Sequence, residues 1–82
     1  MNTYQPISCE YYDFIEHFAI KGEELEIQFY GPDNLIQVIK DRIVDTRIQN
    51  GEEFIVLAQN EEIRLDHIIS LNDKILAEYK SC

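Results

Sequence analysis

Apolar and polar residues between positions 9 and 20 repeat with the period of an α-helix. At roughly 100° per residue, the aromatic and aliphatic side chains fall in one broad arc and the charged side chains in the other. The pattern predicts a helix over residues 9–20 whose apolar side packs on a core. The apolar arc holds Tyr11, Tyr12, Phe14, Ile15, Phe18 and Ala19, and the polar arc holds Glu10, Asp13, Glu16, His17 and the apolar Ile20.

Residues on either side of this stretch carry helix start and stop signals. Pro6 disfavours helical backbone at the residue before it. The Ser8 hydroxyl can accept a hydrogen bond from a free amide of the first turn. Lys21 and Gly22 follow the periodic stretch, and a base followed by a glycine is typical of a helix C-terminus. We therefore expect the helix to begin just after Ser8 and to end near Gly22.

The next part of the chain alternates with the period of a β-strand. In residues 24–30, Leu25, Ile27 and Phe29 point one way, and the residues between them point the other. Residues 31–34 read Gly-Pro-Asp-Asn, which is turn composition. We expect a strand, a turn and a second strand.

Residues 35–48 fit more than one structure. A helix is compatible with residues 39–44, but the density of β-branched residues favours a strand. We predict one long, bent strand with an irregularity near residues 40–42. Asn50-Gly51 then closes a hairpin, because this pair supplies two backbone positions with positive φ at low cost.

Short strands separated by turns are expected in the rest of the chain. Residues 54–58 form a continuous apolar run, as in a strand buried on both faces. Ile63 and Leu65 alternate with polar residues in the next strand, and residues 66–67 mark a tight turn. For residues 75–79, a final strand and a helical turn both remain open, since local propensity does not decide between them.

One helix followed by antiparallel strands with short turns predicts a mainly β fold. The 82 residues are expected to form a single domain, and 45% hydrophobic residues can fill a small core without a disulfide or a metal. Barrel closure would remove strand edges that so small a chain cannot otherwise cover. The expected fold is a small antiparallel β-barrel or sandwich with one N-terminal α-helix, spanning residues 1–82.

The chain is strongly acidic. Sixteen Asp and Glu residues against seven Lys and Arg residues give a formal net charge of −9. This charge repels phosphate backbones and anionic membranes, so we expect neither nucleic acid nor a membrane as a direct partner. It favours a basic partner or serves solubility alone, and charge does not separate these two roles. Arg42, Arg47 and Arg64 lie on predicted strands, where they pair with acids across the sheet or, as the simpler interpretation, lie on the surface.

The two cysteines, Cys9 and Cys82, lie near opposite ends of the chain and in no metal-binding or redox spacing. Two such thiols fit a reducing cytoplasm. The sequence shows no basic region followed by an apolar run at its start, and no apolar stretch of membrane-spanning length. We therefore expect a cytoplasmic protein.

The sequence carries no constellation of catalytic or cofactor-binding residues. Its three glycines are isolated, so it has no Gly-rich phosphate loop. His17 and His67 have no cysteine or second histidine at ligand spacing. The serines lie in no nucleophile-elbow context. We expect no enzymatic activity, no cofactor and no metal.

Two blocks of the chain resemble the Rho-binding antiterminator family (Rof, also called YaeO), small bacterial proteins that inhibit Rho-dependent transcription termination. The middle of the chain matches only in pattern, and His67 stands where the family commonly has lysine. The second block also looks like the corner before the last strand of Sm-type barrels, and the family is known to have an Sm-like barrel with an N-terminal helix. The blocks are Thr3-Tyr4-Gln5-Pro6-Ile7 with Cys9, Glu10, Tyr12, Asp13 and Glu16, and Ile63-Arg64-Leu65-Asp66-His67-Ile68 with Ser70.

The resemblance implies a protein-binding inhibitor. The chain would bind the hexameric helicase Rho on its N-terminal primary RNA-binding region through the acidic helix, and so prevent RNA loading. We expect a monomer when the protein is free. The alternative is an Sm-like RNA-binding or ring-forming module, against which the net charge argues. The contact residues carried over from the family motif are Tyr4, Gln5, Cys9, Glu10, Tyr12, Asp13 and Glu16.

Overall fold

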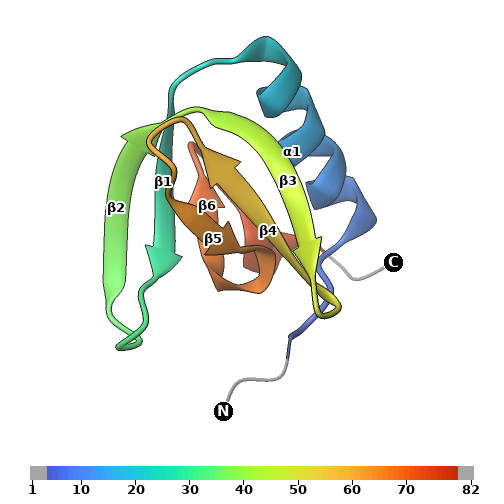
Figure 1. The fold of residues 1–82 in the computed structure, drawn as a ribbon, viewed down its shortest axis with the longest axis vertical. Helices are drawn as coiled ribbons and strands as arrows, with labels where there is room; N and C mark the ends of the chain where they lie inside the picture. Colours follow the sequence, from blue (N-terminus) through green and yellow to red (C-terminus); the bar gives the residue numbers. More distant parts are fainter. Residues whose placement is uncertain (1–3, 80–82) are drawn as a thin grey trace.

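The computed structural model describes residues 4–79. Within this range the chain forms one α-helix, seven β-strands and two short 3-10 helices (Figure 1). In chain order the elements are α1 (Cys9–Lys21), β1 (Leu25–Tyr30), β2 (Ile36–Asp41), β3 (Ile43–Gln49), β4 (Glu52–Leu57), β5 (Glu62–Arg64), η1 (Leu65–His67), β6 (Ile68–Leu71), β7 (Lys74–Ile75) and η2 (Leu76–Glu78).

The strands form two antiparallel sheets, which confirms the prediction of a mainly β fold with one helix. The strand order is β2-β1-β6-β7 in the first sheet and β3-β4-β5 in the second. α1 packs beside β3, at the second sheet (Figure 1). Among the described residues, no helix combines the length and the apolar character needed to cross a membrane.

Both ends of α1 are fixed by the residues that the sequence predicts. The Ser8 hydroxyl accepts a hydrogen bond from the Glu10 amide at 3.1 Å. Gly22 has a left-handed backbone with φ of 66°, and its amide donates to the Phe18 carbonyl at 2.9 Å. Glycine adopts this conformation without a steric penalty, so the helix ends at Lys21.

Asparagines occupy four turns between strands, two of which, at residues 31–34 and 50–51, the sequence predicts. Asn34, Asn50, Asn60 and Asn72 all have positive φ, which asparagine tolerates better than most residues. Asn50 is followed by Gly51 with φ of 78°, and the pair joins β3 to β4. Local turn chemistry therefore sets where these strands end.

The predicted long, bent strand is observed as two strands in different sheets, and the helical alternative for this segment is wrong. β2 ends at Asp41, β3 begins at Ile43, and only Arg42 lies between them. The buried Asp41 carboxylate accepts hydrogen bonds from the amides of Arg42 at 2.8 Å and Gln59 at 3.0 Å. The Ala58 amide donates to the Arg42 carbonyl at 3.0 Å. These bonds fix a corner at the expected irregularity.

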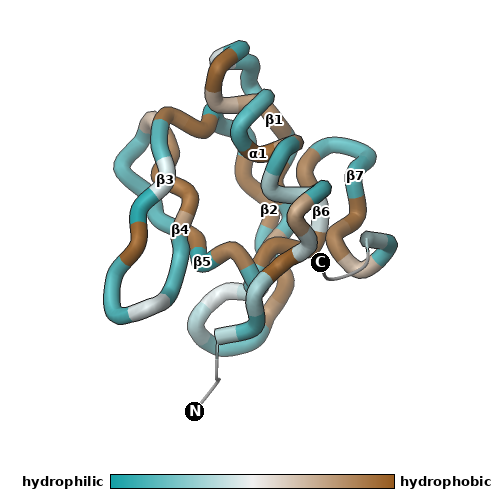
Figure 2. Tube along the Cα trace, turned by 90° about the vertical axis from the view of Figure 1, so that its right-hand side faces the viewer, coloured by the Kyte–Doolittle hydropathy of each residue, from teal (hydrophilic) through white to brown (hydrophobic). Residues whose placement is uncertain are grey.

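A core lies between α1 and the two sheets. Figure 2 shows brown, hydrophobic segments along the strands and teal, hydrophilic residues at the hairpin ends. Full burial of a large aliphatic side chain contributes about 1.5–3 kcal/mol relative to leaving it exposed. The largest fully buried side chains are Tyr11, Ile15, Leu25, Ile27, Ile43, Ile55, Leu57, Leu65 and Leu71.

β4 is not buried on both faces, contrary to the prediction for residues 54–58. Ile55 and Leu57 are fully buried, whereas Phe54 is only half-buried. The guanidinium of Arg47, on the neighbouring strand β3, lies 5.0 Å from the centre of the Phe54 ring. An arginine side chain can cover an apolar ring while its charge stays in water, so a continuous apolar run does not require a second packing layer.

Two predictions near the C-terminal end are refined. Leu65 begins η1 rather than ending a strand, so the tight turn predicted at residues 66–67 belongs to a 3-10 helix. Both alternatives for residues 75–79 occur in part, because β7 ends at Ile75 and η2 follows it. Thr3 and Cys82 lie outside the described residues.

Candidate protein-binding surface

α1 has the two faces that the sequence predicts. Tyr11 and Ile15 are fully buried, and the Tyr11 hydroxyl donates a hydrogen bond to the Lys74 carbonyl at 2.7 Å. Ile20, the one apolar residue on the polar arc, is 86% exposed. Because the buried side fixes the rotation of the helix, the carboxylates of the other side point to solvent as a group. This acidic face consists of Glu10, Asp13 and Glu16, all exposed.

Tyr12 lies at the border between the two faces and is half-buried. Its hydroxyl interacts with Thr46 on β3 and Glu53 on β4. The hydrogen bond with Thr46 lowers the pKa of the hydroxyl, but burial and the negative charges of Glu53 and Glu16 outweigh it and raise the pKa above its ordinary value. Tyr12 therefore joins α1 to the second sheet and does not project freely from the helix.

Cys9 is the first residue of α1 and is exposed. It is disulfide-bonded, so the prediction of a reduced thiol is wrong for this residue. Spacing along the sequence does not show which sulfur atoms a fold brings within bonding distance. A role for Cys9 in binding would therefore not be that of a reactive thiol.

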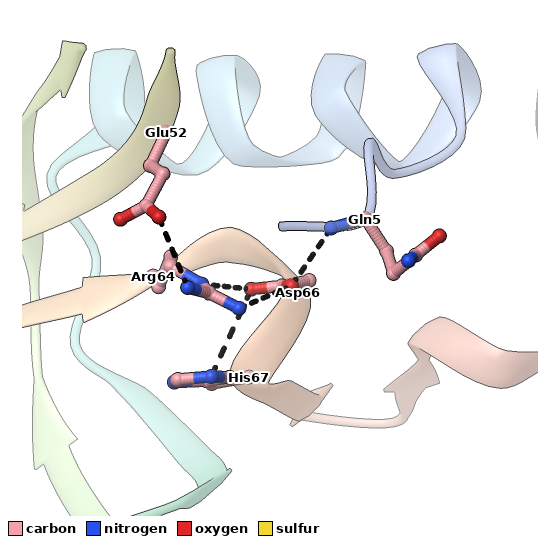
Figure 3. Close-up of polar contacts among 5 residues, drawn as sticks. All are labelled: Gln5, Glu52, Arg64, Asp66 and His67. Carbon is pink, nitrogen blue, oxygen red and sulfur yellow. Dashed lines mark hydrogen bonds and ion pairs between the residues drawn. The ribbon is translucent and has the colours of Figure 1, made fainter. Parts of the chain in front are cut away.

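The other two predicted contact residues, Tyr4 and Gln5, precede the helix and lie against η1. The Gln5 amide donates a hydrogen bond to Asp66 Oδ2 at 2.9 Å (Figure 3). The guanidinium of Arg64 lies 5.6 Å from the centre of the Tyr4 ring. Burial, with the charges of Glu53 and Asp66, raises the pKa of the Tyr4 hydroxyl. The two blocks that carry the family resemblance therefore meet in the fold.

Arg64 and Asp66 form a two-point ion pair at this meeting point (Figure 3). Arg64 Nε donates to Asp66 Oδ1 at 2.6 Å, and Arg64 Nη2 donates to Asp66 Oδ2 at 2.8 Å. A third carboxylate oxygen, Glu52 Oε2, lies 3.3 Å from Arg64 Nη1. The Arg64 and Asp66 side chains are only 10% and 9% exposed, so the interpretation of Arg64 as a surface charge is wrong. Arg47 also pairs across the sheet, with Glu62.

The surroundings of Asp66 favour its charged form. Burial alone would raise the pKa of the carboxyl, but the hydrogen bonds from Arg64 and from the Gln5 amide, with the charge of Arg64, hold it below its usual range. The hydrogen bond to Asp66 likewise raises the pKa of Arg64. His67 Nε2 lies 4.0 Å from Asp66 Oδ1 and has no hydrogen-bond partner among the described residues.

This network predicts a pH-dependent contribution to stability. Because the folded-state pKa of Asp66 is depressed, its stabilisation is fully present above the unfolded value of about 3.9 and is lost as pH falls through the folded value. Asp66→Asn should therefore be less stable than wild type at pH 7, and the difference should shrink below about pH 4. Urea unfolding across pH 2–7 measures it. A difference that stays constant with pH would contradict this assignment.

The predicted contact residues fall into two groups. Glu10, Asp13 and Glu16 form one exposed face with the exposed Cys9 before it, whereas Tyr4, Gln5 and Tyr12 contact β5, η1 and the second sheet. Among residues 4–79, no group of three or more His, Cys, Asp or Glu side chains could hold a metal ion. The sequence analysis did not predict the contact of Tyr4 and Gln5 with Arg64 and Asp66. The one available signal was that both segments carry the family resemblance.

No protein-family model, no curated protein and no solved structure matches the chain.

Proposed function

We propose that the chain is a protein inhibitor of the transcription termination factor Rho. It binds the N-terminal primary RNA-binding region of the Rho hexamer through the acidic face of α1, keeps RNA from loading and so causes antitermination. The observation that carries this proposal is the acidic face itself, three exposed carboxylates on a helix whose opposite side is fixed in the core. Of the first block of the resemblance, Glu10, Asp13 and Glu16 form this face, and Tyr4 and Gln5 lie directly before α1.

Charge complementarity supports this partner. A surface that binds RNA must be basic, and carboxylates held in fixed positions can occupy it in place of phosphates. The net charge of −9 adds long-range attraction to such a surface and repels RNA. The complex should therefore form faster and bind more tightly at low salt.

The Sm-like architecture belongs to the same proposal. Two sheets that share the corner at Arg42, with a 3-10 helix between β5 and β6, are compatible with a closed Sm-like barrel. β6 pairs with β1 on one side and β7 on the other, so a ring of subunits would have to pair through an outer strand, β2, β7, β3 or β5. The net charge of −9 argues against the RNA-binding form of this alternative. We favour a monomer without enzymatic activity over the ring-forming alternative, and a cytoplasmic location now follows only from the proposed partner, because the disulfide at Cys9 removes the argument from reduced thiols.

The test is Rho-dependent termination in a purified transcription system. Adding the protein should raise readthrough at a Rho-dependent terminator and leave an intrinsic terminator unchanged. The assay is run with and without reductant, because Cys9 is disulfide-bonded. Unchanged readthrough with a folded protein in both buffers would refute the proposal.

The competing RNA-binding function makes a separate prediction. With a net charge of −9, the protein should show no appreciable retention of mixed-sequence RNA at low micromolar concentration and physiological salt. Filter binding is the measurement. Tight retention that weakens steeply with salt would favour an Sm-type RNA-binding module instead.

A further inference from the structure

We infer that Arg64 and Asp66 are positioning residues of the binding surface. The pair holds the lead, defined as residues 4–8, against η1, so that Tyr4 and the first turn of α1 form one preorganised surface. The effect on partner binding rests on the proposed function, whereas the effect on the lead does not.

The Asp66 carboxylate joins the lead to η1. Asp66 Oδ2 accepts from both the Gln5 amide, at 2.9 Å, and Arg64 Nη2, at 2.8 Å. The bond from Arg64 Nε to Asp66 Oδ1, at 2.6 Å, fixes the plane of the carboxylate. Because a guanidinium donates in a rigid fork, Arg64 determines where Oδ2 lies and so where Gln5 is held.

The packing under the lead is incomplete. Gln5 and Pro6 are exposed, although Tyr4 and Ile7 on either side are half-buried against the core. A hollow of about 170 Å³, open to solvent, lies between this part of the lead and residues of η1 and η2. The Gln5–Asp66 hydrogen bond joins two of the residues that line it. The hollow is lined by Gln5, Pro6, Ile7, Ser8, Asp66, Leu76 and Tyr79.

The lead continues directly into the binding helix. Ser8 is its last residue, is buried and caps α1. A partner that contacts both Tyr4 and the acidic face would have to order a loose lead on binding, and this ordering lowers affinity. Release of the lead by a change at Asp66 should therefore weaken binding by about tenfold, although Asp66 is not one of the predicted contact residues.

The first test compares Asp66→Asn with Glu62→Gln. Asp66→Asn replaces the carboxylate by a neutral amide at the point where the Gln5 amide and Arg64 Nη2 both donate. Glu62→Gln removes the charge of the neighbouring Arg47–Glu62 pair, which does not touch the lead. We expect Asp66→Asn to speed hydrogen exchange of the Gln5 amide about tenfold more than that of the buried Ile15 amide, which follows the loss of global stability alone. Affinity for Rho should fall about tenfold. Glu62→Gln should leave both quantities near wild type.

A second pair of variants removes the bond from the other side and leaves the Arg64–Asp66 pair intact. Gln5→Pro lacks the donating amide, whereas Gln5→Ala loses the same side chain and keeps the amide. We expect Gln5→Pro to lower the {¹H}–¹⁵N nuclear Overhauser effect at the Tyr4 and Ile7 amides, and to bind Rho about tenfold more weakly than Gln5→Ala. The melting temperatures of the two variants should agree within a few degrees.

Two results would overturn the inference. An ordered lead in both Asp66→Asn and Gln5→Pro would show that the hydrogen bond does not hold it. A loosened lead with unchanged affinity for Rho would show that it positions nothing. If the wild-type protein does not bind Rho, the proposed function fails, while the order of the lead, which needs no partner, still decides whether Arg64 and Asp66 hold it.

Discussion

Replacing Asp13 or Glu16 by lysine should weaken Rho binding by roughly thirtyfold or more, about 2 kcal/mol, and leave the melting temperature within a few degrees of wild type. Both residues are exposed, and exposed charges contribute at most about 1 kcal/mol each to folding. Against a basic partner, the reversed charge replaces attraction by repulsion. Calorimetric melting and binding to purified Rho measure the two effects separately.

A matched control separates this effect from net charge. Glu61→Lys makes the same change of charge at an exposed residue in the turn between β4 and β5, away from α1. Its binding to Rho should stay within a few-fold of wild type.

Glu10→Lys should weaken Rho binding as Asp13→Lys does, with some added loss of helix because a positive charge in the first turn opposes the helix dipole. Wild-type binding by a folded Asp13→Lys, Glu16→Lys double variant would place the contact elsewhere.

Ile15→Ala should have the largest effect on stability. Ile15 is fully buried between α1 and the sheets, so truncation leaves a cavity and costs about 2–5 kcal/mol. In a domain of this size, each kcal/mol lowers the melting temperature by roughly 4–8 °C. Ile15→Val, which removes one methyl group, should cost only about 0.5–1.5 kcal/mol. Urea unfolding of the two variants measures the difference.

Phe18 provides the comparison within the same helix. The helical wheel places Phe18 beside Ile15 on the apolar arc, but in the fold its side chain is only half-buried. Phe18→Ala should therefore cost less than the 3–5 kcal/mol typical of a buried phenylalanine. A cost for Phe18→Ala equal to or above that for Ile15→Ala would contradict the packing seen at this end of α1.

The features that the sequence predicted well are set by local chemistry. Ser8 fixes the start of α1 because its hydroxyl accepts a hydrogen bond from an amide of the first turn, and Gly22 fixes the end because it adopts a left-handed backbone. Asn50-Gly51 closes its hairpin for an equally local reason, since both residues adopt positive φ. The acidic face followed from the helical period alone.

The features that the sequence did not predict depend on contacts between distant segments. The near-burial of Arg64 follows from Asp66, Glu52 and the lead, which the fold assembles around it. The corner at Arg42 depends on a carboxylate, Asp41, that accepts from the amide of Gln59 across the sheet boundary. Neither contact produces a periodic pattern, so propensity and hydrophobic spacing carry no sign of it.

Displacement of RNA from Rho tests the proposed function most directly. A fluorescent pyrimidine-rich RNA bound at the primary site of purified Rho is titrated with the protein, and its anisotropy is followed. We expect full displacement by wild type, at a concentration that rises with salt, and little displacement by the Asp13→Lys, Glu16→Lys double variant. RNA that stays bound to Rho at saturating, folded wild-type protein would contradict binding of the acidic face to the RNA-binding region.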